Sequence, residues 1–313
     1  MELFTITLPA SIEQALAKLT ALLTDSISDD LHKAQGSSRA LIRYTPHTGE
    51  IVSCEAILPH FQLASHGTAV YRSAAKAVAE FIVTEMEPHI LSAIIRRKYR
   101  EHYAVDAPMI EKYCHELLHG SEWDGLGTKF LDADKQRRKL KVSEEIEHYL
   151  QGHTSLHLDG FTMFRLQPYR KELAEIVDYA LDEYVLDKQY QEFISLLKYF
   201  VGLQESKVPL VHLVHKGNHE FVMYNEKFQP FEPKPHSDRM VAEMLETEMN
   251  IEDMVISSLI AVSPKQIMIH TRQSDMQVIR TIETIFDNRV SVCLQCVDCS
   301  PCFDVANNGL IQP

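Results

Sequence analysis

The sequence predicts a predominantly helical α+β fold, in which a helical middle is flanked by strand-bearing N- and C-terminal segments. Through most of residues 67–205, apolar side chains recur every three or four residues, which is the spacing of an amphipathic helix. Much of the apolar sequence in residues 1–66 and 206–313 alternates with polar residues instead, which is the period of a half-buried strand. We therefore expect an N-terminal α/β segment, a helical region and a C-terminal α/β region with these bounds.

The N-terminal region is expected to contain three strands and one helix. The helix follows Pro9 and Ser11 and keeps a helical step as far as Leu23. The polar residues 28–38 are expected to form a loop. The expected strands span residues 3–8, 40–44 and 51–58, and a turn at residues 47–49 joins the last two.

The helical region is expected to consist of several helices separated by Pro and Gly. Pro88 lies inside the first apolar stripe, which begins near residue 68, and is expected to kink or restart that helix. The later helices are expected at residues 109–119, 131–150 and 169–201. Apolar residues 184–186 widen the stripe of the last segment, so we expect one or two central helices that are buried on two sides.

The C-terminal region is expected to begin with a β-hairpin and to end with a strand–helix–strand unit. Residues 209–215 and 220–225 alternate around Gly217-Asn218, which is a strong hairpin signal. Two helices are expected after a proline-rich linker, at residues 238–248 and 251–261. The final unit comprises residues 266–270, 276–287 and 290–293, and such a crossover implies parallel strands. This order is also compatible with one sheet shared by both ends of the chain.

Composition and charge favour a globular protein without nucleic-acid or membrane partners. The chain has 313 residues, of which 45% are hydrophobic and 24% are charged. Its net charge of −13 opposes binding to phosphate-rich surfaces, and we expect the basic runs at residues 96–100 and 137–141 to lie on solvated helix faces. There is no run of 18 apolar residues and no signal-peptide pattern at residues 1–10, so we expect a cytoplasmic protein without a membrane span.

Four of the six cysteines stand at a three-residue step in the segment VSVCLQCVDCSPCFD, residues 291–305. They are Cys293, Cys296, Cys299 and Cys302. In a reducing cytosol such cysteines bind a metal or remain free more often than they form disulfides. Thiolates suit Zn²⁺ and iron–sulfur clusters, and we therefore predict a metal site at these four residues.

Zinc fits this spacing better than an iron–sulfur cluster. The last gap is two residues, and Pro301 precedes the fourth cysteine, whereas ferredoxin runs have a longer last gap and a following proline. One short loop rarely supplies all four corners of a site, so three local cysteines and a remote ligand form an easier geometry. The alternatives are reduced or redox-sensitive thiols without metal and a thiol patch of no consequence.

The segment HELLH at residues 115–119 has the order of a zincin helix. In such a helix His115 and His119 would bind Zn²⁺ from one face while Glu116 activates water. The segment lacks the third histidine of the longer metzincin pattern, and nothing in the sequence marks Glu144 or Glu145 as a third ligand. With 16 histidines in the chain, the pattern also arises by chance.

Three histidines bracket the expected hairpin turn. They are His212, His215 and His219, and no carboxylate–histidine spacing there specifies a metal site. We expect them to be surface residues.

Five stretches carry a family resemblance. They are LDGFTMFRLQPYRKEL (158–173), VDYALDEYVLDKQYQEFISLLKYFVGLQES (177–206), VHLVHKGNHEFVMYNE (211–226), EDMVISSLIAVSPKQIMIH (252–270) and TIETIFDNRVSVC (281–293). These stretches resemble the YtxC family of sporulation proteins. The resemblance implies an endospore-forming bacterium as the setting, and it carries over no activity, substrate or catalytic residue.

The preferred hypothesis is a cytoplasmic protein without catalytic activity that acts through unidentified protein partners during sporulation. A structural metal would sit at the C-terminal cysteines. One alternative is a zinc-dependent hydrolase centred on HELLH, and the other is a thiol-based, redox-responsive regulator.

Overall fold

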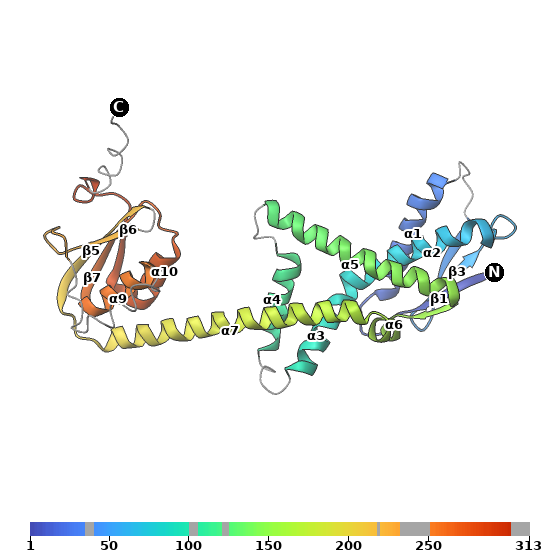
Figure 1. Cartoon of the computed structure of the whole chain (residues 1–313), viewed down its shortest axis with the longest axis horizontal. Helices are drawn as coiled ribbons and strands as arrows, with labels where there is room; N and C mark the ends of the chain where they lie inside the picture. The colour runs from blue at the N-terminus through green and yellow to red at the C-terminus, as the bar shows by residue number, and fades with distance from the viewer. Residues whose placement is uncertain (35–40, 100–105, 121–124, 218–219, 232–250, 302–313) are drawn as a thin grey trace, which may run out of the picture. The chain divides into compact units, whose positions relative to one another are not determined.

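The computed structural model confirms a predominantly helical α+β fold and describes residues 1–34, 41–99, 106–120, 125–217, 220–231 and 251–301 (Figure 1). The chain forms two compact units, residues 1–186 and residues 187–313. The N-terminal strands belong to the same unit as the first helices because they share one hydrophobic core. Within these described residues, each unit contains one mixed four-stranded sheet.

The sheet of the first unit has the strand order β2-β3-β1-β4. Strand β1 pairs antiparallel with β3 and parallel with β4, and β2 and β3 form a hairpin. Buried and exposed side chains alternate along β1, as expected for a strand with one face against the core. Phe4 and Ile6 are fully buried, whereas Thr5 and Thr7 are partly exposed. The strands are β1 (Glu2–Thr7), β2 (Ile42–His47), β3 (Ile51–Ala56) and β4 (Ser155–His157).

The helices of the first unit follow the predicted stripes. Helix α1 packs on α2, and α2 packs on α5, so the apolar faces that the sequence predicted meet one another. Pro88 has the predicted effect: a π-helical turn, Ile82–Met86, separates α2 from α3 just before it. The α-helices are α1 (Ala15–Ala34), α2 (Leu63–Phe81), α3 (Glu87–Lys98), α4 (Ala107–His119), α5 (Gly125–Gly152) and α6 (Leu158–Phe164).

Two local predictions differ from the structure in this unit. The segment expected as a loop from residue 28 is helical as far as Ala34, because a polar composition removes the apolar stripe without breaking the helix. The short strand β4 and helix α6 were not predicted, since a three-residue strand carries too little pattern to detect.

Helix α7 (Gln167–Leu203) is a single helix, and the boundary between the two units falls within it. The prediction that it is buried on two sides is wrong. Val177 and Ala180 are fully buried, but Leu186 is 60% exposed and Leu196 is 66% exposed. Apolar residues on several sides of a helix show which surfaces could be buried. Tertiary packing decides which of these surfaces are buried in the folded protein.

The sheet of the second unit has the strand order β6-β5-β7-β8. The predicted hairpin is confirmed by the antiparallel pair β5–β6, and the predicted crossover is confirmed by the parallel pair β7–β8. The expectation that both ends of the chain could share one sheet is wrong, because the described strands of each end pair among themselves. The elements are β5 (Val208–Gly217), β6 (Glu220–Tyr224), α9 (Ile251–Val262), β7 (Pro264–His270), α10 (Gln277–Phe286) and β8 (Val290–Cys293).

The two faces of the second sheet have different environments. Leu213, Ile267 and Ile269 point into a core that also contains buried side chains of α9 and α10. Met268 and His270 alternate with these residues along β7 and therefore face the other side. The predicted helix at residues 238–248 lies outside the described residues.

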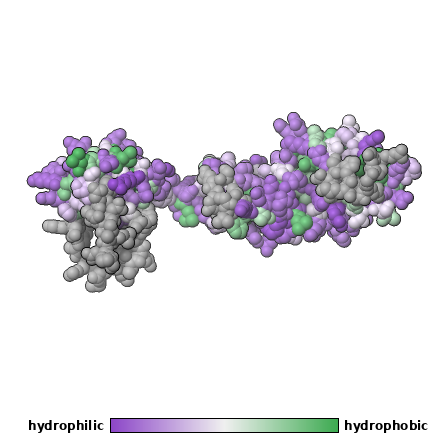
Figure 2. Space-filling view, turned by 90° about the horizontal axis from the view of Figure 1, so that it is seen from above, coloured by the Kyte–Doolittle hydropathy of each residue, from purple (hydrophilic) through white to green (hydrophobic). Residues whose placement is uncertain are grey.

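Hydrophilic residues cover most of the visible surface in Figure 2, as expected for a chain with a net charge of −13. Within the described segments, no helix combines the length and the apolar character that a membrane crossing requires.

Candidate metal centre

The parallel register of β7 and β8 brings His270 and Cys293 side by side. The two residues are direct partners across the strand pair, and the backbone N–H of Thr271 donates to the carbonyl of Cys293 at 3.1 Å. Both strands end here, and alternation turns both side chains away from the hydrophobic core. His270 is only 2% exposed, so its imidazole is held in a defined place.

The loop after β8 folds the next two cysteines back toward this point. The backbone N–H of Cys296 donates to Cys299 Sγ at 3.1 Å, and the backbone N–H of Ser300 donates to the Cys296 carbonyl at 3.1 Å. These bonds close a tight turn, which is why a three-residue step places both sulfurs on one side. The sulfurs of Cys296 and Cys299 lie 3.4 Å apart, and Cys299 is fully buried.

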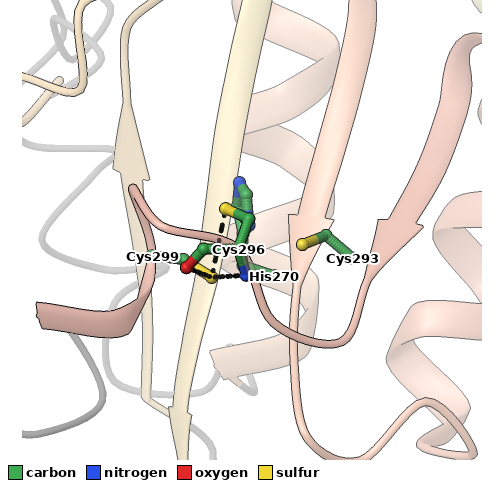
Figure 3. A group of neighbouring side chains, drawn as sticks. All are labelled: His270, Cys293, Cys296 and Cys299. Atoms are coloured by element: carbon green, nitrogen blue, oxygen red, sulfur yellow. Dashed lines mark hydrogen bonds between the residues drawn. The ribbon is translucent and has the colours of Figure 1, made fainter.

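Three of the four predicted cysteines therefore gather around one histidine, as Figure 3 shows. One ligand atom from each of His270, Cys293, Cys296 and Cys299 lies within 4.8 Å of every other. In a tetrahedral zinc site with bonds of about 2.3 Å, neighbouring sulfurs are about 3.8 Å apart. The Cys296 and Cys299 sulfurs would move slightly apart and the more distant ligand atoms slightly closer to hold an ion. Cys302 lies outside the described residues.

Hydrogen bonds prepare one of the three thiols for ionisation. Burial raises the pKa of Cys299 to about 11 and raises the pKa of Cys293 as well. Burial acts on Cys296 in the same direction, but hydrogen bonds with the backbone of Cys299 and Asp298 and with the thiols of Cys299 and Cys293 oppose it, and the pKa of Cys296 is lowered overall. The cluster therefore stabilises a thiolate at Cys296, and metal binding would displace the remaining thiol protons.

The histidine ligand makes contacts with both of its ring nitrogens. His270 Nδ1 lies 3.8 Å from Cys296 Sγ, and His270 Nε2 lies 2.9 Å from Nδ1 of His212 on β5. Burial lowers the pKa of both imidazoles, while the Asp298 carboxylate acts in the opposite direction. The neutral imidazole is the form that binds a metal, so burial favours the ligating state.

The sequence predicted that a remote ligand was needed but did not identify His270. One signal could have found it: in the predicted crossover, His270 is the last residue of one parallel strand and Cys293 is the last residue of the next. The expectation that the hairpin histidines are surface residues is wrong for His215. Its side chain is buried, and its Nδ1 lies 3.1 Å from Thr271 Oγ1. His212 is partly buried, and His219 lies outside the described residues.

The HELLH segment does not form a comparable centre in the described part of the chain. The rings of His115 and His119 lie 5.1 Å apart on α4, but Glu116 is exposed and pairs with Lys112 at 3.3 Å. No described group of three or more possible ligands includes these histidines, and neither Glu144 nor Glu145 supplies a third ligand. His119 instead faces Glu87, with 3.7 Å between Nε2 and Oε1.

Replacing His119 is expected to change the acid limb of the stability curve. Burial, together with the nearby His115, Lys135 and Arg138, lowers the pKa of His119 to about 4. Because the folded state favours the neutral imidazole, its contribution is present above the unfolded pKa of about 6.5 and is lost as pH falls toward 4. Relative to His119→Gln, the parent should lose about 2 kcal/mol of unfolding free energy over this range.

Urea unfolding of both proteins between pH 4 and pH 7 measures this difference. His89→Gln is the matched control, because His89 is exposed on α3. A constant difference between parent and His119→Gln across the range would contradict the prediction.

The second basic run is neutralised within the fold. Arg137 and Arg138 both pair with Asp134, Lys139 pairs with Glu80, and Lys141 pairs with Glu172. From the first run, Lys98 pairs with Asp178 at 2.6 Å. These cations therefore have acidic partners inside the protein. The expectation of a solvated helix face is wrong for Arg138, whose side chain is buried.

Comparisons with known proteins agree with the resemblance seen in the sequence. The model of a family described as YtxC-like matches residues 72–291. The chain is 27% identical over 213 residues to the uncharacterized protein YtxC of Bacillus subtilis (strain 168), an alignment that covers 68% of this chain and 73% of that protein. No solved structure matches the chain. The family match includes His212 and His270 and ends two residues before Cys293.

Proposed function

This chain belongs to the YtxC-like family, and we propose that it is a non-enzymatic member in which His270, Cys293, Cys296 and Cys299 hold one structural Zn²⁺ ion. The observation that carries the proposal is the convergence of these four ligand atoms within 4.8 Å of one another. Three thiolates and one imidazole form a ligand set typical of structural zinc.

The number of protein ligands supports a structural role rather than catalysis. A catalytic zinc ion has three protein ligands and keeps one position open for water or substrate. Here four protein donors would fill a tetrahedral shell. The ion would fix the end of β8 and the loop after it against β7, where a small hydrophobic cluster contains Val214 and Cys299.

We also propose that the protein acts in the cytoplasm through protein partners during endospore formation. The family resemblance supports the setting, and the closed ligand set supports a role other than turnover of a substrate. The zinc centre would then serve to stabilise the second unit.

Protein purified without oxygen and without chelator is expected to contain one zinc per chain. Cys296→Ser should reduce the zinc content to below about a tenth of the parent, because it removes the sulfur best stabilised as a thiolate. The measurement is elemental analysis combined with an absorption spectrum.

Cys114→Ala is the matched control for this experiment. Cys114 is fully buried in the first unit, where burial raises its pKa to about 12, so the variant should keep its zinc. If the analysis finds iron and sulfide and the protein has a brown absorption, the site holds an iron–sulfur cluster and the zinc assignment is wrong. A parent protein free of any metal would disprove the proposal.

A further inference from the structure

We propose that His212 is a positioning residue of this metal centre, which holds His270 in the one tautomer that can bind the ion. The inference rests on the proposed zinc site and adds a residue that supplies no ligand atom. Its basis is the contact of 2.9 Å between His212 Nδ1 and His270 Nε2.

The geometry assigns a different task to each nitrogen of His270. Nδ1 is the nitrogen nearest to the sulfurs, at 3.8 Å from Cys296 Sγ, whereas Nε2 points to His212. A neutral imidazole carries its proton on one nitrogen only, and the other nitrogen offers a lone pair. A metal on Nδ1 therefore requires the proton to reside on Nε2.

His212 satisfies that requirement when its Nδ1 accepts a hydrogen bond from the protonated Nε2 of His270. The reverse arrangement, with His212 Nδ1–H donating to His270 Nε2, would place the His270 proton on Nδ1, where it would face the sulfurs and block the ion. Metal-binding histidines generally donate their second N–H to an acceptor, and that contact fixes ring orientation and tautomer. In this chain the acceptor is another imidazole.

The surroundings of His212 keep this acceptor in place. The Phe228 ring lies 4.6 Å from the His212 ring and 5.5 Å from the His270 ring, measured between centroids. The centroids of the two imidazoles lie 5.2 Å apart, and their planes differ by 29°. Strand β5 pairs directly with β7, so the backbone fixes the distance between the two histidines. His212 is therefore part of a packed aromatic group beside the ligand.

The test compares zinc affinity in the full-length chain carrying His212→Leu or His212→Asn. Leucine fills similar space without an acceptor, whereas the asparagine Oδ1 stands near the position of Nδ1 and can accept the same hydrogen bond. We expect His212→Leu to weaken zinc binding about 10–100-fold, the range found when such contacts are removed. His212→Asn should restore most of the affinity.

His215→Leu is the matched control, since His215 is a buried histidine on the same strand whose Nδ1 lies 3.1 Å from Thr271 Oγ1. Affinity is measured by competition with a chromophoric chelator, and the Co²⁺ absorption spectrum reports the ligand field. Equal zinc affinities for parent and a folded His212→Leu would overturn the inference, as would equal losses in His212→Leu and His215→Leu.

Nitrogen-15 NMR of the zinc-loaded parent tests the tautomer without any variant. The inference requires a protonated Nε2 and a metal-shifted Nδ1 in His270. Zinc bound with the proton on Nδ1 would overturn the role of His212 and leave the zinc site standing. A parent that binds no zinc at all would overturn the site and, with it, this inference.

Discussion

The Cys299→Ala protein is expected to bind no zinc and to exchange the amide hydrogens of β7 and β8 much faster than the parent. Cys299 is fully buried, and its sulfur lies 3.4 Å from that of Cys296. Loss of one thiolate opens the ligand shell and removes the stabilisation that the bound ion gives to the folded state. For free zinc at 1,000 times its dissociation constant, that stabilisation is about 4 kcal/mol.

Hydrogen exchange followed by mass spectrometry measures this effect at residues 264–270 and 290–293. The same comparison in excess chelator isolates the loss of side-chain packing, because neither protein then holds metal. Cys54→Ala controls for removal of a buried thiol in the first unit, where Cys54 is fully buried. If β7 and β8 exchange at the same rate in Cys299→Ala and in the parent at the same zinc concentration, the prediction is contradicted.

Replacing Arg138 alone is expected to cost more stability than replacing it together with Glu87. Both side chains are 1% exposed, and Arg138 Nε lies 3.5 Å from Glu87 Oε2. Tyr169 donates to the same carboxylate oxygen at 2.5 Å. Removing one charge from such a pair leaves the other buried and uncompensated, which typically costs about 3–5 kcal/mol.

The double variant Glu87→Gln with Arg138→Met should lose less than half of that amount. Glu87 Oε1 and Arg138 Nη2 have no hydrogen-bond partner among the described residues, so the pair is incompletely satisfied and its removal forfeits little. Urea unfolding of the two single variants and the double variant measures the coupling energy. An additive cycle, in which the two single losses sum to the double loss, would show that the pair is uncoupled.

The loss in Arg138→Met should shrink in acid. Burial raises the pKa of Glu87, and Arg138 opposes that effect, so removing Arg138 raises the pKa further. A raised folded pKa contributes stability below the unfolded value and loses it as pH rises, so the variant should recover toward the parent between pH 7 and pH 5. Lys171→Ala, which breaks an exposed pair with Glu175, controls for surface charge and should cost less than about 1 kcal/mol.

The sequence predicted those elements whose pattern is local. Gly217-Asn218 marked the β5–β6 hairpin, and the strand expected at residues 266–270 is β7. Strand β4 was missed because only its pairing with β1 makes it a strand. The paired residues, Thr5 of β1 and Ser155 of β4, lie far apart in sequence. The exposure of Leu186 was missed because a wide apolar stripe does not show which of its sides packs.

The candidate site divides in the same way. Cys293, Cys296 and Cys299 were predicted from a spacing that acts within one short loop. His270 and His212 lie beside these cysteines because of the register of β5, β7 and β8. Strand register is a non-local property, and it can be derived from a sequence only once the order of the strands in the sheet is known.

The crossover from β7 through α10 to β8 has a topological consequence. An ion held jointly by His270 and Cys293 would close that crossover into a ring, with the peptide backbone on one side and two coordination bonds on the other. Because such a site rarely exists in the unfolded chain, the ring forms in the folded state and opposes local opening of the crossover. A single backbone cut anywhere within the ring would still leave the two fragments tethered to each other by the metal.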